Sequence, residues 1–191
     1  MSRRQTPRTT GRPTKRVPRI WLMTDSRFGA DLIPAIKRLP SGSGVIFRHY
    51  HLDDNARLAL FREIRRICVR RGHILLAAGD ERAARRWHAD GFHKRGARRQ
   101  SKRMIHSAPV HNRRELAEAA RTAVDLVLIS PMFATASHSG ARPLGRASFL
   151  ALAKQLTDMR VIALGGLTAR KAATLDKRVV HGWAAIDAFR R

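Results

Sequence analysis

The feature that most constrains the fold is a regular alternation of short apolar runs with segments of helical periodicity. Each run has the length and composition of a strand that is buried on both faces of a parallel sheet. Such an alternation is typical of α/β proteins. The predicted strands are residues 20–24, 45–48, 73–77, 89–93, 104–106, 124–129, 161–164 and 182–186. Eight units predict a compact (β/α)8 TIM barrel, and a doubly wound open sheet is the alternative.

The clearest helix begins at Asp53 or Asp54 and ends at Gly72. Apolar residues recur along it at the spacing of one core-facing stripe, while arginines occupy the other face. The stripe contains Leu58, Phe61, Ile64 and Cys68. Because the chain's single cysteine lies in this stripe, we expect it to be a core residue rather than a nucleophile. Further helices are predicted within residues 31–39, 81–88, 112–121, 149–156 and 169–175, and residues 94–103 are predicted to form a loop or frayed helix.

The chain is strongly basic, with 39 Lys and Arg against 14 Asp and Glu and a formal net charge of +25. Residues 1–19 lack periodicity and predict a short flexible basic tail, which leaves residues 20–191 as the barrel domain. The positive electrostatic potential of such a chain attracts phosphorylated metabolites and nucleic acid alike. Aromatic residues make up only 6% of the chain and provide no base-stacking platform, so nucleic acid is expected to bind non-specifically, through charge alone.

The cellular location of the protein is predicted from the targeting and membrane-spanning segments that the sequence lacks. No apolar run approaches the roughly 20 residues of a membrane span, so no membrane partner is expected. No apolar segment of an export signal follows Arg3 and Arg4. A cytoplasmic location is therefore the expectation. The oligomeric state is left open, with a homo-oligomer among the alternatives.

A Gly-Gly turn follows the seventh predicted strand. Gly165 and Gly166 come directly after Val161–Leu164, and Thr168 is a suitable N-cap for the next helix. A strand, two glycines and a helix N-terminus form an arrangement in which backbone N–H groups hold a phosphate. In a TIM barrel, phosphates favour the loops after strands seven and eight. The alternative interpretation is a tight turn without a ligand.

Five motifs together resemble the thiamine phosphate synthase/TenI family of TIM-barrel thiamine-biosynthesis proteins. The opening strand ends in Thr-Asp, and an Ala-Asp-Gly-x-His element, a Pro-x-x-x-Thr-x-Ser loop, a Gly-Gly turn and a last strand follow in the family's order. They occupy residues 21–25, 89–93, 130–138, 162–167 and 182–186. The resemblance implies one of two activities. The synthase joins an aminopyrimidine diphosphate to a thiazole phosphate with the help of Mg²⁺, whereas the tautomerase moves a proton on the thiazole phosphate without a metal.

The residues that the family's synthase uses are mostly replaced in this sequence. Tyr50 stands where the resemblance implies a lysine, and Ala78-Gly79 stands in place of an Asn-Asp pair, with Asp80 as the nearest carboxylate. A metal-binding aspartate is replaced by a cation within Arg95–Arg98, and a lysine is replaced by His138. We therefore expect no metal site and no cofactor, and Mg²⁺ only if synthase activity persists on substituted ligands. The arginines of residues 94–103 are candidate countercharges for a phosphate.

The resemblance also implies roles for individual residues. His111 matches a histidine proposed as the acid/base of TenI-type members, and an imidazole suits proton transfer near neutral pH. The expected substrate-binding residues are Arg48, Thr135, Ser137 and His138, and the expected phosphate-binding residues are Gly165, Gly166, Ile186 and Asp187. A carboxylate repels a phosphate. We therefore expect the side chain of Asp187 to turn away and cap the final helical turn.

Three functions remain open at this point. The first is an enzyme of thiamine biosynthesis that acts on a small phosphorylated substrate, a thiazole phosphate, by tautomerisation or by a diverged synthase reaction. The second is a barrel that binds a phosphorylated ligand without catalysis. The third is a basic protein associated with nucleic acid. The residues favour metal-independent tautomerisation among these.

Overall fold

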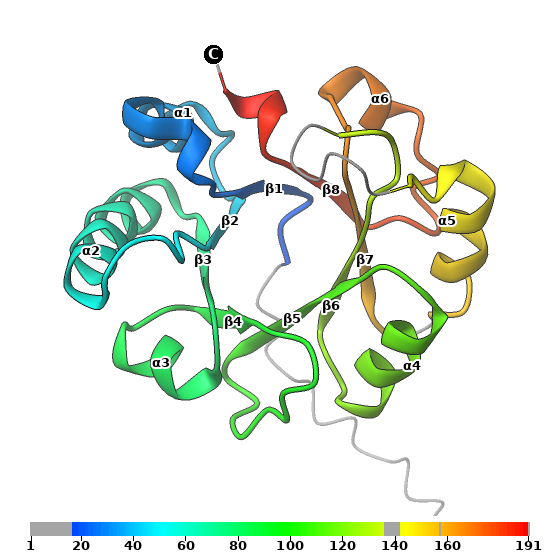
Figure 1. The fold of residues 1–191 in the computed structure, drawn as a ribbon, viewed down its shortest axis with the longest axis horizontal. Coiled ribbons are helices and arrows are strands. Elements are labelled where there is room, and N and C mark those ends of the chain that lie inside the picture. Colours follow the sequence, from blue (N-terminus) through cyan, green and yellow to red (C-terminus); the bar gives the residue numbers. More distant parts are fainter. Residues whose placement is uncertain (1–16, 136–141, 157, 191) are drawn as a thin grey trace, which may run out of the picture.

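The computed structural model describes residues 17–135, 142–156 and 158–190. Eight parallel strands pair in chain order and close into a barrel, which confirms the predicted TIM barrel and excludes the open sheet (Figure 1). The strands are β1 (Ile20–Met23), β2 (Gly44–Phe47), β3 (Ile74–Ala78), β4 (Gly91–His93), β5 (Ile105–Val110), β6 (Leu126–Ile129), β7 (Arg160–Leu164) and β8 (Gly182–Ala185). Residues 1–16 of the predicted tail lie outside the described residues.

Helices surround the barrel on its outer face (Figure 1). They are α1 (Leu32–Arg38), α2 (Asp54–Arg71), α3 (Glu81–Arg86), α4 (Arg113–Arg121), α5 (Gly145–Ala153) and α6 (Ala169–Ala173), with short 3-10 helices at Ser26–Asp31 (η1) and Asp187–Phe189 (η3). Within the described residues, no helix combines the length and apolarity needed to cross a membrane.

Helix α2 has the ends and the buried face that its sequence predicts. The Asp53 carboxylate accepts a hydrogen bond from the Ala56 N–H at 2.9 Å, and Gly72 ends the helix in the left-handed conformation. Phe61, Ile64 and Cys68 are buried against the barrel. Burial raises the pKa of the Cys68 thiol to about 12, so this cysteine is a core residue, as predicted.

The connection between β4 and β5 carries no helix. Residues 94–104 form turns, bends and irregular chain, held to neighbouring elements by ion pairs. Arg95 pairs with Glu115 and Glu118 on α4, and Arg99 pairs with Asp125 at the start of β6. The arginines that the sequence offered as countercharges for a ligand therefore include two that pair with the protein's own carboxylates.

Strand β5 extends to Val110, four residues beyond its predicted end at His106. The prediction stopped too early because His106, Ser107 and Pro109 interrupt the apolar pattern. In the folded barrel His106 and Ser107 are buried, and the His106 ring stacks on Phe92 at 4.2 Å between centroids. The longer strand delivers His111 directly at its carboxyl end.

A buried polar pair links β4 to β5. His93 Nδ1 forms a 2.8 Å hydrogen bond with Ser107 Oγ, and the Ser107 hydroxyl also lies 3.3 Å from the Phe92 carbonyl oxygen. Burial lowers the pKa of His93 to about 3, and the charges of Arg48 and His106 act in the same direction. The folded protein therefore holds this imidazole neutral.

This burial predicts a stability that declines in mild acid. Below its ordinary pKa of 6.5, His93 is protonated in the unfolded chain but stays neutral in the folded protein until about pH 3. The stability associated with the neutral ring is present above pH 6.5 and is lost as the pH falls towards 3, by up to about 1.4 kcal/mol per pH unit. In urea unfolding across this range, His93→Gln should lose stability less steeply than the wild type.

The control for this experiment is His88→Asn. His88 is exposed, and its φ of 57° is a conformation that asparagine tolerates. The unfolding free energy of this variant should change with pH as it does in the wild type. If the unfolding free energy of His93→Gln falls with pH as steeply as that of the wild type, the loss of stability in acid does not come from His93.

Candidate functional site

A pocket opens at the carboxyl ends of six of the strands, where TIM barrels bind their ligands. Residues that end β1, β7 and β8, or that follow β2, β5, β6, β7 and β8, form its wall. The lining residues are Met23, Arg48, His111, Ser130, Pro131, Thr135, Leu164, Gly165, Gly166, Leu167, Ala185, Ile186 and Asp187. Seven of the nine residues predicted for the site are therefore brought together: Arg48, His111, Thr135, Gly165, Gly166, Ile186 and Asp187. Ser137 and His138 lie outside the described residues, and all the assigned roles stay predictions.

The Gly-Gly turn after β7 lies directly against the loop after β6. Gly165 and Gly166 have φ angles of 98° and 62°, which glycine adopts without strain. A Cβ on Gly166 would lie 2.3 Å from the Ala134 carbonyl oxygen, and one on Gly165 would lie 2.8 Å from the Pro131 Cα. The Phe133 N–H donates to the Gly165 carbonyl at 3.1 Å. The two glycines are thus required by the packing of the pocket wall, whether or not a phosphate binds.

A lysine fastens the same turn from the side of α6. The Thr168 hydroxyl caps this helix by accepting a 3.3 Å hydrogen bond from the Lys171 N–H, as the sequence predicts. Lys171 Nζ donates to the Gly166 carbonyl at 3.0 Å and lies 4.9 Å from the centre of the Phe133 ring. The β7 turn, the β6 loop and α6 are therefore fixed to one another.

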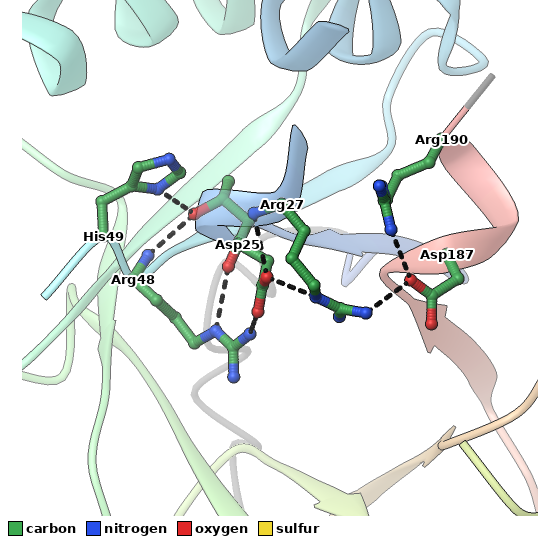
Figure 2. A network of polar contacts seen from close by, with 7 residues as sticks. Asp25, Arg27, Arg48, His49, Asp187 and Arg190 are labelled. Atoms are coloured by element: carbon green, nitrogen blue, oxygen red, sulfur yellow. Dashed lines mark hydrogen bonds and ion pairs between the residues drawn. The ribbon is translucent and has the colours of Figure 1, made fainter. Parts of the chain in front are cut away.

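Arg48 is held in the pocket wall by the end of β1. Its Nε donates to the Thr24 carbonyl at 2.9 Å, and its Nη2 donates to Asp25 Oδ2 at 2.7 Å (Figure 2). Burial lowers the pKa of Arg48, although Asp25 opposes this effect, and an arginine remains cationic under such shifts. Burial would raise the pKa of Asp25, but hydrogen bonds from Arg27 and the charges of Arg27 and Arg48 outweigh it, so the net shift is downward.

The predicted capping role of the Asp187 side chain is wrong, because η3 has Ile186 at its N-cap and no side-chain capping hydrogen bond. The Asp187 Oδ1 accepts hydrogen bonds from Arg27 at 3.0 Å and from Arg190 at 3.3 Å (Figure 2). Arg27 also donates to Asp25 at 2.7 Å. Charges therefore alternate along Arg48, Asp25, Arg27, Asp187 and Arg190. The physical reason is barrel closure, which places the loop after β1 beside the turn after β8.

His111 stands at the opposite wall of the pocket, between β5 and α4. Its Nδ1 and its backbone N–H both lie 2.8 Å from Glu115 Oε2. The Glu115 N–H in turn donates to the Asn112 side chain at 3.0 Å, so Asn112 is the N-cap of α4, at the start of the range predicted for this helix. The imidazole is 42% exposed, which leaves it accessible from the pocket.

Several residues of the site escaped the sequence analysis. The apolar lining residues Met23, Leu164, Leu167 and Ala185 resemble ordinary strand and turn residues. Arg27 was missed because its ion pair with Asp187 joins two loops that are far apart in the chain, and Arg190 was missed although its partner Asp187 lies three residues before it. Glu115 did carry one, since Asn112-Arg-Arg-Glu115 is the pattern of a capping box.

The donor set does not fit the Mg²⁺ ion that the resemblance implies for a synthase. Mg²⁺ prefers several carboxylate oxygens and waters in an octahedron. At this end of the barrel, three arginines bind two of the carboxylates: Arg48 and Arg27 bind Asp25, and Arg27 and Arg190 bind Asp187. Asp80 caps α3 through a 2.8 Å hydrogen bond from the Ala83 N–H. Among the described residues, no three His, Cys, Asp or Glu side chains gather as a metal site.

Comparison with protein-family models identifies the family of this chain. The model of the family described as thiamine monophosphate synthase matches residues 21–189. A curated protein of Aquifex aeolicus, provisionally named thiamine-phosphate synthase 2, is 25% identical over 183 residues, which are 91% of this chain and 98% of the relative. The thiamine biosynthesis bifunctional protein ThiED of Geobacter sulfurreducens is 27% identical over 166 residues, which are 82% of this chain and 33% of the relative.

Among solved structures, the thiamine phosphate pyrophosphorylase from Pyrococcus furiosus has the same fold. It superimposes with a TM-score of 0.75 over 89% of this chain and 86% of its own, at 19% sequence identity. At this level of identity the likeness shows the barrel architecture.

The close approach of the β6 loop predicts a specific sensitivity at Gly166. Gly166→Ala would place a Cβ in the left-handed region and against the Ala134 carbonyl oxygen. Gly42→Ala is the matched control, because Gly42 has a similar φ of 77° and a Cβ there would meet no atom within 4 Å. Both should lose about 1 kcal/mol from backbone strain, and Gly166→Ala a further 1–3 kcal/mol, roughly, from overlap. If urea unfolding shows that Gly166→Ala and Gly42→Ala lose equal amounts of unfolding free energy, the overlap with the β6 loop is contradicted.

Proposed function

Because this chain belongs to the thiamine monophosphate synthase family of thiamine biosynthesis, we propose that it acts on a thiazole phosphate by metal-independent proton transfer. The family's name describes a transferase. The observation that carries the finer proposal is that one pocket combines an accessible imidazole, His111, with the Gly-Gly turn, while the carboxylate in its lining, Asp187, is already bound by arginines. This combination suits a proton shuttle better than a metal-assisted displacement of pyrophosphate.

The phosphate of the substrate is assigned to the β7–β8 side of the pocket. Gly165 and Gly166 line the pocket at the end of β7, and Ile186 and Asp187 line the same space after β8. Phosphates favour the backbone of these two loops in TIM barrels. The strong positive charge of the chain favours an anionic ligand. Arg48 supplies a cation to the pocket itself.

The ring of the substrate is assigned to the apolar part of the lining. Met23, Leu164, Leu167 and Ala185 offer surface for a flat heteroaromatic ring. Thr135 lies in the same wall and offers a hydroxyl for a polar group of the ring system. Ser137 and His138 remain proposed contacts of the substrate.

His111 is assigned the role of acid and base. A neutral imidazole takes a proton from one position of the substrate, and the resulting imidazolium returns a proton to another position, so the atoms and charges of the substrate balance. Both steps use the same side chain, and neither needs a metal. An imidazole titrates close enough to neutral pH to act in both directions.

Paired turnover assays test this proposal. One assay supplies the thiazole phosphate tautomer alone, and the other adds the aminopyrimidine diphosphate; each is run with Mg²⁺ and with a chelator. Tautomer conversion should tolerate the chelator and should fall by about 10²- to 10⁴-fold in His111→Ala. The exposed His88, replaced by Asn, serves as the histidine control and should keep wild-type turnover.

Each other outcome assigns a different function. Thiamine phosphate formed only with Mg²⁺ would mean that the synthase reaction persists on substituted ligands, and the tautomerase proposal would fail. No turnover in either assay, with retained binding of the thiazole phosphate, would indicate a non-catalytic phosphate-binding barrel.

The charge of Asp187 gives a separate prediction for the phosphate subsite. A carboxylate in the pocket wall disfavours a nearby anion, and Arg27 and Arg190 only partly offset it at the surface. Asp187→Asn should therefore bind inorganic phosphate about 3- to 10-fold more tightly at low salt, a difference of about 1 kcal/mol. Calorimetric titration at low and moderate salt measures it.

The control is Asp176→Asn, which removes another arginine-paired aspartate that lies outside the pocket lining. It should leave the affinity for phosphate unchanged. Tighter binding in both variants would indicate a general effect of net charge rather than a phosphate subsite at Asp187.

A further inference from the structure

The carboxylate of Glu115 contacts His111 at two places. Its Oε2 lies 2.8 Å from the imidazole Nδ1 and 2.8 Å from the backbone N–H of the same residue. Its other oxygen, Oε1, pairs with the Arg95 guanidinium. The Glu115 side chain is 17% exposed, whereas its partners His111 and Arg95 are 42% and 41% exposed.

The ionisation state of the Glu115 carboxylate determines which ring nitrogen of His111 holds a proton. Burial raises the pKa of Glu115, but the hydrogen bonds from His111 and the charges of His111 and Arg95 outweigh it, so the net shift is downward and the group is ionised at neutral pH. An ionised carboxylate only accepts hydrogen bonds. The Nδ1 atom of His111 must therefore donate, and in a neutral imidazole the Nε2 atom is left as the proton acceptor.

We infer that Glu115 is the positioning residue of His111: it holds the Nδ1 proton, fixes the ring and leaves Nε2 as the base that serves the pocket, while Arg95 anchors the carboxylate. The inference deepens the proposed function and rests on it for its catalytic part. Its structural part, the choice of tautomer, stands on the contacts alone.

A capping role does not account for these contacts. A capping box needs a hydrogen-bond acceptor at the third helical position, and glutamine supplies one as well as glutamate does. Here the oxygen accepts from the residue before the Asn112 cap, and it reaches the ring of that residue as well. The negative charge is used by the imidazole and by Arg95, not by the helix start.

The charged groups around this carboxylate come from three elements. Arg95 lies in the β4–β5 connection, His111 follows β5, and Glu118 lies one turn further along α4. Glu118 Oε2 is 3.7 Å from Arg95 Nε, so the guanidinium lies between two glutamates, and it is the Glu115 carboxylate that contacts His111. Glu118 is therefore a matched control for the loss of a negative charge beside Arg95.

The experiment compares Glu115→Gln with Glu118→Gln in the full chain. Side-chain ¹⁵N resonances of His111, identified by their loss in His111→Ala, report the tautomer of the neutral ring. In the wild type and in Glu118→Gln, Nδ1 should give the shift of a protonated nitrogen and Nε2 that of an unprotonated one. In Glu115→Gln both shifts should move towards the average of the two tautomers.

Turnover of the thiazole phosphate tautomer provides the second readout. Glu115→Gln should lower kcat by about 10- to 100-fold with KM within about twofold of the wild type, as expected for a partner that orients a working histidine. Glu118→Gln should leave both constants unchanged. Equal losses of kcat in the two variants would overturn the positioning role, because they would reflect only the charge balance at Arg95.

The two readouts separate this inference from the proposed function. An unchanged His111 spectrum in Glu115→Gln would overturn the inference even if the wild type catalyses tautomerisation. An altered spectrum in a protein without turnover would sustain the tautomer assignment and would refute the catalytic role of His111.

Discussion

The pairing of β1 with β8 is the contact on which the pocket depends. The ladder joins Ile20 to Trp183 and Leu22 to Ala185, residues that are far apart in the chain. A Cβ on Gly182 would lie 2.2 Å from the Arg19 carbonyl oxygen, so a side chain at this position would hold the two strands apart. The junction brings the loop after the first strand beside the turn after the last one, and the ion pair between Arg27 and Asp187 follows directly from it.

The same junction is fastened at its other end by the residues that precede β1. The indole N–H of Trp21 donates to the Pro18 carbonyl at 2.8 Å, and the Trp183 N–H donates to the Arg19 carbonyl at 2.8 Å. His181 Nε2 lies 2.9 Å from the Val17 carbonyl oxygen. Closure of the barrel therefore rests on backbone groups, which any sequence could supply, together with a few side chains that fit only this geometry.

The sequence predicts the strands well where burial and hydropathy agree, and it fails where they do not. The end of β5 was missed because His106 and Ser107 are polar residues with partners inside the barrel wall: His106 Nε2 lies 2.8 Å from the Lys94 carbonyl oxygen, and Ser107 bonds to His93. Hydropathy cannot distinguish such residues from loop residues, because their partners lie on neighbouring strands. The Gly-Gly turn and the Asn112 cap could be predicted, because each depends on residues that are close in the sequence. The ion pairs of Arg27 with Asp187 and of Arg95 with Glu115 could not, because their partners lie on other elements.

The arginine-rich composition has a local consequence at the pocket end of the barrel. Asp25, Asp187 and Glu115 are all bound by arginines. An oxygen that accepts from a guanidinium has less capacity to bind a divalent ion, and that ion would also meet the positive charge of the arginine. These arginines therefore oppose a Mg²⁺ site twice, by occupying its oxygen ligands and by repelling the ion. One of these pairs also bears on the proposed reaction: Arg95 holds one carboxylate oxygen of Glu115 while the other oxygen contacts the His111 Nδ1, so a charge that disfavours a metal ion is also the one that would anchor the partner of the proposed base.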